Sequence, residues 1–291
     1  MNIRDSLAVA ATRIQSDAAS RESSLLLAHA LGKSREWVIA HPEAELTPEQ
    51  RERYTALIAQ AANGMPLPYL LGHWGFFGLD FLVTPDVLIP RPETELLVER
   101  AIAKLQFQIP NSKLVDIGTG SGIIAVALAA KLPQAHITAA DISPAALAVA
   151  KTNAEKHSVA DRITFVHSDL LSSFITRPQQ GVHPSSFDLI VANLPYVPSA
   201  DLDTLPVAKH EPRLALDGGP DGLRLIRRLL ADAPKVLAPV GAILLEIEYR
   251  QGEAVAALAR EAFPNAVVKV HKDLAGLDRA IEINETMNNE Q

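Results

Sequence analysis

Asp116-Ile117-Gly118-Thr119-Gly120-Ser121-Gly122 joins a short apolar run to an alanine-rich apolar segment that begins at Ser121. Glycines in such a turn adopt backbone conformations that other residues avoid, and they let the backbone approach a ligand closely. The turn comes directly before the expected N-terminus of a helix, where unpaired N–H groups attract polar groups. The stretch therefore predicts the first strand, ligand-binding turn and helix of a doubly wound α/β sheet.

Strand-like and helix-like segments alternate on both sides of this turn. Helical patterns begin at Ser121 and Pro144 and cover residues 223–237 and 252–262. Such alternation is typical of a parallel sheet with helices on both faces. We therefore predict a Rossmann-like α/β domain over residues 92–291. The apolar runs expected to form its strands are residues 113–117, 136–140, 163–167, 187–192, 242–247, 267–270 and 280–283.

The first 64 residues are predicted to form a small helical bundle, because apolar residues recur there at helical spacing. Gly32 follows one of these helices in the position of a C-cap. Thr47-Pro48-Glu49-Gln50 has the residues of a capping box. Residues 65–91 are rich in Pro, Gly and aromatic residues, so they are predicted to be a linker that contains a β-hairpin. The aromatic residues of this hairpin are expected to form its core rather than a platform for stacking bases.

Composition limits the classes of protein to consider. The chain has 291 residues, of which 48% are hydrophobic and 21% charged, as in globular proteins with a large core. It has no cysteine, so disulfides and thiolate metal sites are excluded, and no metal site is expected. No apolar run reaches the ~18 residues of a membrane-spanning helix, and the first residues lack the apolar segment of a signal peptide. These features predict a cytoplasmic protein without a membrane partner.

The net charge of −7, with Lys and Arg scattered along the chain, argues against a DNA partner. A duplex-binding protein usually presents a basic face, because neutralising phosphates dominates its affinity.

The spacing of the glycines in the first turn indicates which ligand it holds. A dinucleotide-binding turn needs a third glycine five residues after Gly118, where this chain has Ile123. The Asp-x-Gly-x-Gly-x-Gly spacing found instead favours S-adenosylmethionine, because the anion of Asp116 suits a sulfonium and an ammonium group better than a pyrophosphate. The alternative is an ordinary tight turn. The predicted contacts of this loop with the cofactor come from Asp116, Gly118, Thr119, Gly120, Ser121 and Gly122.

Two further strand ends carry candidate cofactor-binding residues. Asp141 ends the second strand, about 20 residues after the glycine turn, where an acidic side chain can accept hydrogen bonds from both ribose hydroxyls. Asp169 and Leu170 follow the third strand. Asp169 is expected to bond the adenine amino group, and Leu170 to cover the adenine ring. The alternative for both aspartates is a solvated strand end.

Asn193-Leu194-Pro195-Tyr196 follows the fourth apolar strand and is the candidate catalytic motif. It is similar to the Asn-Pro-Pro-Tyr signature of enzymes that methylate a planar amide-like or amino nitrogen. The side-chain oxygen of Asn193 and the carbonyl of Leu194 are expected to accept the two N–H groups of such a nitrogen. Pro195 stiffens the turn by fixing φ, Tyr196 offers a flat face, and Asn193 also borders the cofactor. No general base is expected. The alternative is a structural turn containing Asn and Pro.

Over nearly its whole length the chain resembles the HemK/PrmC family, the N5-glutamine methyltransferases of peptide chain release factors. The family implies a class I S-adenosylmethionine-dependent methyltransferase fold with a mixed seven-stranded sheet. It also implies a helical N-terminal domain, here residues 1–64, that docks the substrate. The segments that carry the resemblance, besides the two motifs above, are residues 66–72, 89–95, 211–216, 218–223 and 273–279.

The resemblance implies methylation of the glutamine in the Gly-Gly-Gln loop of class I release factors, which modulates translation termination. Two residues depart from the family pattern: Leu194 replaces the first proline of the motif, and Leu170 stands where the family often has an aromatic residue. Arg91, Glu93 and Glu95 are interpreted either as partners in salt bridges or as the lining of a peptide entrance. The main alternative function is an adenine amino-methyltransferase acting on nucleic acid, and another is a non-catalytic cofactor-binding protein.

Overall fold

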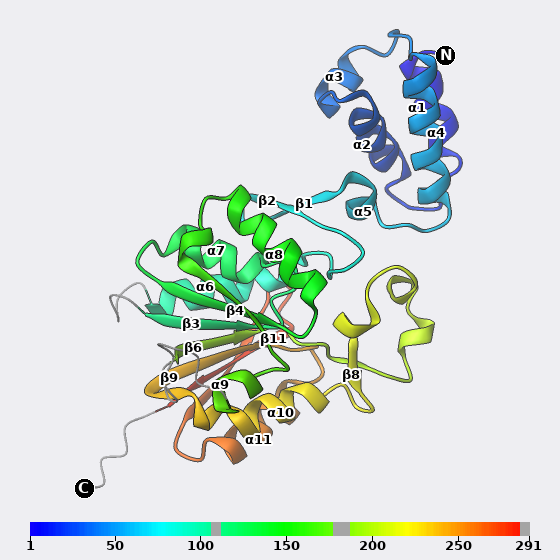
Figure 1. The fold of residues 1–291 in the computed structure, drawn as a ribbon. Coiled ribbons are helices and arrows are strands. Elements are labelled where there is room, and N and C mark those ends of the chain that lie inside the picture. Colours follow the sequence, from blue (N-terminus) through cyan, green and yellow to red (C-terminus); the bar gives the residue numbers. More distant parts are fainter. Residues whose placement is uncertain (106–111, 177–186, 286–291) are drawn as a thin grey trace, which may run out of the picture. The chain divides into compact units, whose positions relative to one another are not determined.

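The computed structural model describes residues 1–105, 112–176 and 187–285, and its internal contacts divide the chain into two units, Met1–Trp74 and Gly75–Gln291 (Figure 1). The first unit is helical. It consists of α1 (Ile3–Ala11), α2 (Ala19–Leu31), α3 (Arg35–Ala40), α4 (Pro48–Ala62) and α5 (Leu67–Leu71). These helices enclose one apolar core that includes Leu26, Leu27, Tyr54 and Ile58.

The helix ends of this unit follow the predicted signals. Gly32 ends α2 with a left-handed φ of 62°, which a residue without Cβ adopts at no steric cost. Thr47 and Gln50 form the reciprocal capping box at the start of α4. The structure thus confirms the helical interpretation of the first 64 residues.

Helix α5 was not expected, because it lies in the segment predicted to be a linker. Its two prolines, Pro66 and Pro68, occupy the N-cap and the first turn, where a missing N–H is tolerated. Leu70 on this helix is buried in the core of the first unit. The domain boundaries predicted at residues 64 and 91 stay predictions.

The expected hairpin is present as β1 (His73–Phe76) and β2 (Leu79–Leu82). Phe77 and Gly78 join the strands with φ values of 51° and 75°, as in the turns favoured by two-residue hairpins. Phe76 and Phe81 are buried against α6 (Glu95–Leu105) and α7 (Ile123–Lys131). These two rings are therefore core residues of the hairpin, as predicted.

The second unit contains a seven-stranded sheet of the order β10-β11-β9-β6-β3-β4-β5. Strand β11 runs antiparallel to both of its neighbours, while β9, β6, β3, β4 and β5 are parallel to one another. This arrangement confirms the mixed seven-stranded sheet. The strands are β3 (Lys113–Ile117), β4 (His136–Asp141), β5 (Ile163–His167), β6 (Phe187–Ala192), β9 (Leu237–Glu246), β10 (Val267–Lys272) and β11 (Asp278–Asn284).

Helices cover both faces of this sheet (Figure 1). Helices α6, α7 and α8 (Pro144–Lys156) pack on one face, and α10 (Arg224–Asp232) and α11 (Gly252–Ala262) pack on the other. Side chains alternate between the two cores along each strand, as the pleat requires: Leu114 belongs to the first core, and Val115 and Ile117 to the second. A short helix, α9 (Ser172–Thr176), follows β5.

The segment after β6 was not predicted in detail. It forms a small second sheet from β7 (Val197–Pro198) and β8 (Asp217–Gly219). Between these strands are the 3-10 helices η3 (Leu202–Thr204), η4 (Pro206–Lys209) and η5 (Arg213–Ala215). Three other 3-10 helices are η1 (Pro92–Thr94), η2 (Ala160–Arg162) and η6 (Ala233–Lys235). In the described part of the chain, no helix has the length and apolarity to span a bilayer.

Candidate active site

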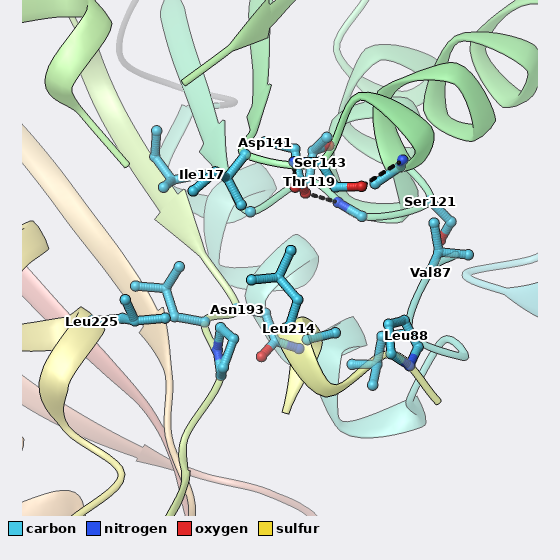
Figure 2. A pocket seen from close by; sticks show the side chains of 18 of the residues that line it. Val87, Leu88, Ile117, Thr119, Ser121, Asp141, Ser143, Asn193, Leu214 and Leu225 are labelled. Atoms are coloured by element: carbon cyan, nitrogen blue, oxygen red, sulfur yellow. Dashed lines mark hydrogen bonds between the residues drawn. The ribbon is translucent and has the colours of Figure 1, made fainter. Parts of the chain in front are cut away.

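A cavity of about 680 Å³ opens at the carboxyl ends of β3, β4, β5 and β6, where ligands bind in open α/β sheets. Asp141, Ser143 and Thr119 lie along one side of it, and Asn193 and Leu214 lie on the other side (Figure 2). Of the predicted site residues, Asp116, Gly122 and Tyr196 do not line the cavity. Those that do are Gly118, Thr119, Gly120, Ser121, Asp141, Asp169, Leu170, Asn193, Leu194 and Pro195.

The glycine turn after β3 has the conformation that its sequence implies. Gly118, Gly120 and Gly122 have φ values of 74°, 55° and 81°, in the left-handed region that other residues rarely adopt. A side chain on Gly122 would place its Cβ 3.0 Å from the Cβ of Ala150 on α8. Gly122 therefore serves the packing of the turn on α8, and Gly118 and Gly120 face the cavity.

Asp116 lies beneath this turn and is only 1% exposed. Its Oδ2 accepts hydrogen bonds from the Thr119 hydroxyl at 2.7 Å and from the N–H of Ala125 at 3.2 Å. Burial raises the pKa of Asp116 to about 7. Its Oδ1 is buried and has no hydrogen-bond partner within the described residues. Asp116 therefore ties the turn to the start of α7 and keeps one acceptor oxygen available.

Asp141 is held in a single orientation at the end of β4. Its Oδ2 accepts from the N–H of Gly120 and its Oδ1 accepts from the N–H of Ser143, both at 2.9 Å. Burial raises the pKa of this carboxyl above its usual range, and these hydrogen bonds oppose the effect. Because each carboxylate oxygen has a second lone pair, Asp141 can accept further hydrogen bonds from a ligand in the cavity.

Asp169 and Leu170 occupy the third side of the cavity. Asp169 forms an ion pair with Arg228 at 2.7 Å, and both residues line the cavity. Leu170 has a φ of 51° although it is not a glycine, and its carbonyl accepts from the Ser168 hydroxyl at 2.8 Å. Such a conformation is uncommon for a bulky residue and occurs often at ligand-binding sites. Sequence reasoning missed Arg228, because nothing in its local pattern relates it to β5.

The Asn193–Tyr196 motif contacts the glycine turn directly. Leu194 is buried, and its Cδ2 lies 3.3 Å from the position that a Cβ on Gly118 would take. Asn193 is half-buried, and its Nδ2 donates to the hydroxyl of Thr94 at 3.0 Å. Burial and the nearby Glu246 raise the pKa of Tyr196 to about 12. Tyr196 does not line the cavity, and its predicted role against a planar acceptor stays a prediction.

Glycines of β8 and of the turn after it hold the backbone of this motif. A Cβ on Gly218 would lie 2.7 Å from the carbonyl oxygen of Pro195, and a Cβ on Gly222 would lie 2.1 Å from that of Tyr196. The Tyr196 carbonyl also accepts from Gln251 Nε2 at 3.2 Å. Only glycine allows this approach, which gives segment 218–223 a physical role.

Two further segments line the cavity, residues 85–91 and 212–217, and they only partly overlap the family-like segments 89–95 and 211–216. They contribute Val87, Leu88 and Leu214 (Figure 2). The two segments are joined by a salt bridge of 2.5 Å between Arg91 and Glu211. Arg91 therefore fits both earlier interpretations, because it forms a salt bridge and also lines the cavity. Glu95 has a structural role instead, since its Oε1 accepts from the N–H of Phe77 at 2.7 Å.

The sheet order, the glycine turn after β3 and the acidic end of β4 define the class of protein. They are the features of a class I, Rossmann-like S-adenosylmethionine-dependent methyltransferase. Among solved structures, the chain resembles a methyltransferase from Pyrococcus furiosus. The TM-score is 0.50 at 19% identity, over 73% of this chain and 92% of that chain.

Comparison with protein families identifies the chain more closely. Residues 7–72 match the PrmC N-terminal domain, and residues 92–209 match the methyltransferase small domain. The release factor glutamine methyltransferase of Moorella thermoacetica is 44% identical over 283 residues, which are 96% of this chain and 97% of that protein. That of Bacillus anthracis is 37% identical over 97% of this chain and 98% of its own length. The chain belongs to the release factor glutamine methyltransferase family.

Proposed function

We propose that this protein transfers a methyl group from S-adenosylmethionine to the side-chain amide nitrogen, N5, of a glutamine in class I peptide chain release factors. The acceptor glutamine is that of the Gly-Gly-Gln loop, and its methylation modulates translation termination in the cytoplasm. One observation carries the proposal: the Asn193-Tyr196 motif and the glycine turn pack on each other through Leu194 and Gly118 and border one cavity. A cofactor on the turn and an amide at Asn193 would therefore be adjacent.

The residues around the cavity fit S-adenosylmethionine. The volume of the cavity, about 680 Å³, lies in the usual range of small-molecule sites. Asp116 Oδ1 is a buried acceptor without a partner among the described residues, so it suits the ammonium end of this cofactor through an intervening donor. Asp141 suits the ribose hydroxyls, and Asp169 with Leu170 suits the adenine. When bound, the cofactor supplies an electrophilic methyl group on a sulfonium.

Asn193 and Leu194 would act on the acceptor amide. The lone pair of an amide nitrogen is delocalised into its carbonyl, so the nitrogen is a poor nucleophile. Two acceptors that hold its N–H groups favour the pyramidal nitrogen of the transition state. The Nδ2 of Asn193 donates to Thr94, so the Oδ1 of the same amide points away from Thr94. The methylated nitrogen is acidic enough to lose its proton to water, so no general base is required.

Replacing Asp141 by alanine is expected to weaken the binding of S-adenosylmethionine. Each charge-assisted hydrogen bond that is lost costs about 1.5–3 kcal/mol, and Asp141 also holds the N–H of Gly120 in place. Titration calorimetry measures the change. A matched control is Asp188→Ala, because Asp188 bonds the N–H of Lys113, at the start of β3. Unchanged affinity in a folded Asp141→Ala protein excludes the ribose role.

The proposed function is tested by following labelled methyl groups from S-adenosylmethionine to purified class I release factor, to adenine-containing DNA, and to no added acceptor. We expect transfer to the release factor alone. Transfer only to DNA would instead support the alternative adenine methyltransferase, and binding of the cofactor without transfer would support a non-catalytic protein.

Intact release factor is expected to be methylated with a much higher kcat/KM than a free peptide that contains Gly-Gly-Gln. A short, glycine-rich loop offers few contacts, and ordering it costs conformational entropy. We propose that the helical N-terminal unit supplies the missing affinity by docking the body of the release factor. The measurement is a comparison of kcat/KM for the two substrates. Equal values would show that the loop alone carries recognition, without docking.

A further inference from the structure

A buried acid lies directly behind the acceptor motif. Glu246 is the last residue of β9 and is only 1% exposed. The parallel register between β6 and β9 places Leu245 opposite Ala192. Glu246 comes directly after Leu245 and Asn193 directly after Ala192, so both residues lie at the same edge of the sheet. Neither carboxylate oxygen of Glu246 has a partner within full hydrogen-bond geometry in the described residues. Burying a carboxyl group without hydrogen-bond partners costs folding free energy, so we expect Glu246 to have a functional role that offsets this cost.

Polar and charged side chains from several elements lie around Glu246. The hydroxyl of Thr94 and the side-chain amide of Asn193 lie close enough to lower its pKa, and so does Arg279 on β11. Glu93 opposes them, and burial outweighs all these effects, so the pKa of Glu246 is raised to about 7. Arg279 is already paired with Asp273 at 3.2 Å. Tyr196 also faces Glu246, and burial and this carboxyl raise the pKa of that phenol. The side chains close enough to hydrogen-bond with Glu246 are those of Thr94 and Asn193.

The orientation of the Asn193 amide decides whether the motif works. The side-chain amide has a donor end and an acceptor end of nearly the same shape. A glutamine N–H group can be accepted only when the Asn193 oxygen faces it. An ionised carboxylate accepts hydrogen bonds and never donates them. A carboxylate behind Asn193 and Thr94 therefore attracts the NH2 end, which turns the oxygen towards the cavity.

We propose that Glu246 is a positioning residue for methyl transfer, which acts by fixing the Asn193 side-chain amide with its oxygen towards the acceptor nitrogen. The chain of contacts runs from Glu246 to Thr94 and Asn193, and the Asn193 Nδ2 donates to Thr94 as this role requires. The inference rests on the proposed function, because it concerns the same acceptor site.

Glu246→Gln tests the proposal, because glutamine keeps the shape of the side chain but can also donate. Its NH2 group can pair with the Asn193 oxygen and stabilise the inverted amide. We expect kcat to fall about tenfold to a hundredfold, as for loss of a charge-assisted hydrogen bond. The Kd for S-adenosylmethionine is expected to stay unchanged. A kcat within twofold of the wild-type value overturns the proposal.

Stability separates a positioning role from a structural one. Folding raises the pKa of Glu246 from 4.5 to about 7. The stabilisation that its protonated form contributes is therefore present below pH 4.5 and is lost as the pH rises through about 7. Glu246→Gln removes the buried charge, so at pH 8 its Tm is expected to equal or exceed that of the wild type. A lower Tm together with a lower kcat would indicate a structural role and overturn the proposal.

The pH profile gives a second readout. Below pH 7 the protonated Glu246 can donate, so kcat of the wild-type protein is expected to rise with pH through about 7. In Glu246→Gln, kcat is expected not to show this rise with pH. The profile is measured with saturating cofactor, because Asp116 also has a pKa of about 7 and is proposed to interact with the cofactor. A rise that persists unchanged in Glu246→Gln contradicts the proposed role.

The chain offers a matched control and a second variant. Glu282→Gln removes a carboxylate from β11 that pairs with His271 at 2.7 Å, away from the cavity lining, and is expected to leave kcat unchanged. Thr94→Val removes the hydroxyl that receives Asn193 and is expected to lower kcat non-additively with Glu246→Gln. If Glu246→Gln does not fold, an unchanged kcat in Thr94→Val overturns the proposal. Failure of the proposed function is a different result, since the wild-type protein would then transfer no methyl group to release factor.

Discussion

Asn193→Ala is expected to lower kcat for methylation of release factor by about two orders of magnitude or more. In the proposed mechanism the side-chain oxygen of Asn193 accepts an N–H of the glutamine, and the variant would lose this contact, which is strongest when the nitrogen becomes pyramidal. Asn193 is half-buried, and its side-chain Nδ2 donates to the hydroxyl of Thr94. The sheet beneath it is formed by other residues, so the fold is expected to persist.

Single-turnover kinetics with saturating cofactor measure this effect, and circular dichroism checks the fold. Asn284→Ala is a suitable control, because Asn284 also makes a side-chain hydrogen bond, to Lys104, and does not line the cavity. The control is expected to turn over normally. Turnover of Asn193→Ala at the wild-type rate would show that the acceptor amide is held by other groups.

Gly222→Ala is expected to abolish most activity by displacing the acceptor motif. The added Cβ would lie 2.1 Å from the carbonyl oxygen of Tyr196, and Gly222 has a φ of 75°. The clash cannot be relieved by rotating a side chain, because the atom it meets belongs to the backbone. The strand pair β7–β8 must therefore shift, and a displacement of about 1 Å at a catalytic group costs about a hundredfold in kcat.

Gly276→Ala is the matched control for this prediction. Gly276 has a similar φ of 79°, but a Cβ there would meet nothing within 4 Å. It therefore suffers only the conformational penalty of about 1 kcal/mol and is expected to keep its kcat. If both variants lose activity equally, the loss comes from backbone strain alone and the supporting contact with Tyr196 is unimportant.

The sequence was most informative where structure is local. The turn from Asp116 to Gly122 could be predicted because a tight turn needs residues with positive φ, which glycine adopts most easily. All three glycines of the turn have positive φ. The capping box at Thr47 is likewise complete within four residues. Helix α5 was missed because prolines are typical of linkers as well as of first helical turns.

The sequence was least informative where distant segments meet. Asp116 and Gly122 do not line the cavity, since one ties the turn to α7 and the other packs on α8, and their predicted contacts with the cofactor stay predictions. Arg228 had no signal in the sequence, and the partner of Arg91 in its salt bridge, Glu211, could not be identified from the sequence. No pattern along the chain indicates that Glu246 lies beside Asn193.

By itself the sequence determined the alternation of strands and helices, the glycine turn and the absence of cysteine chemistry, and it singled out the Asn193–Tyr196 motif. Hydrophobic periodicity and backbone conformation are properties of neighbouring residues, so they can be read along the chain. Only the tertiary structure decided that Leu194 packs on Gly118, that Gly222 supports Tyr196, and that Glu246 stands behind Asn193. These contacts depend on strand order and register, which bring together residues that are far apart in the chain.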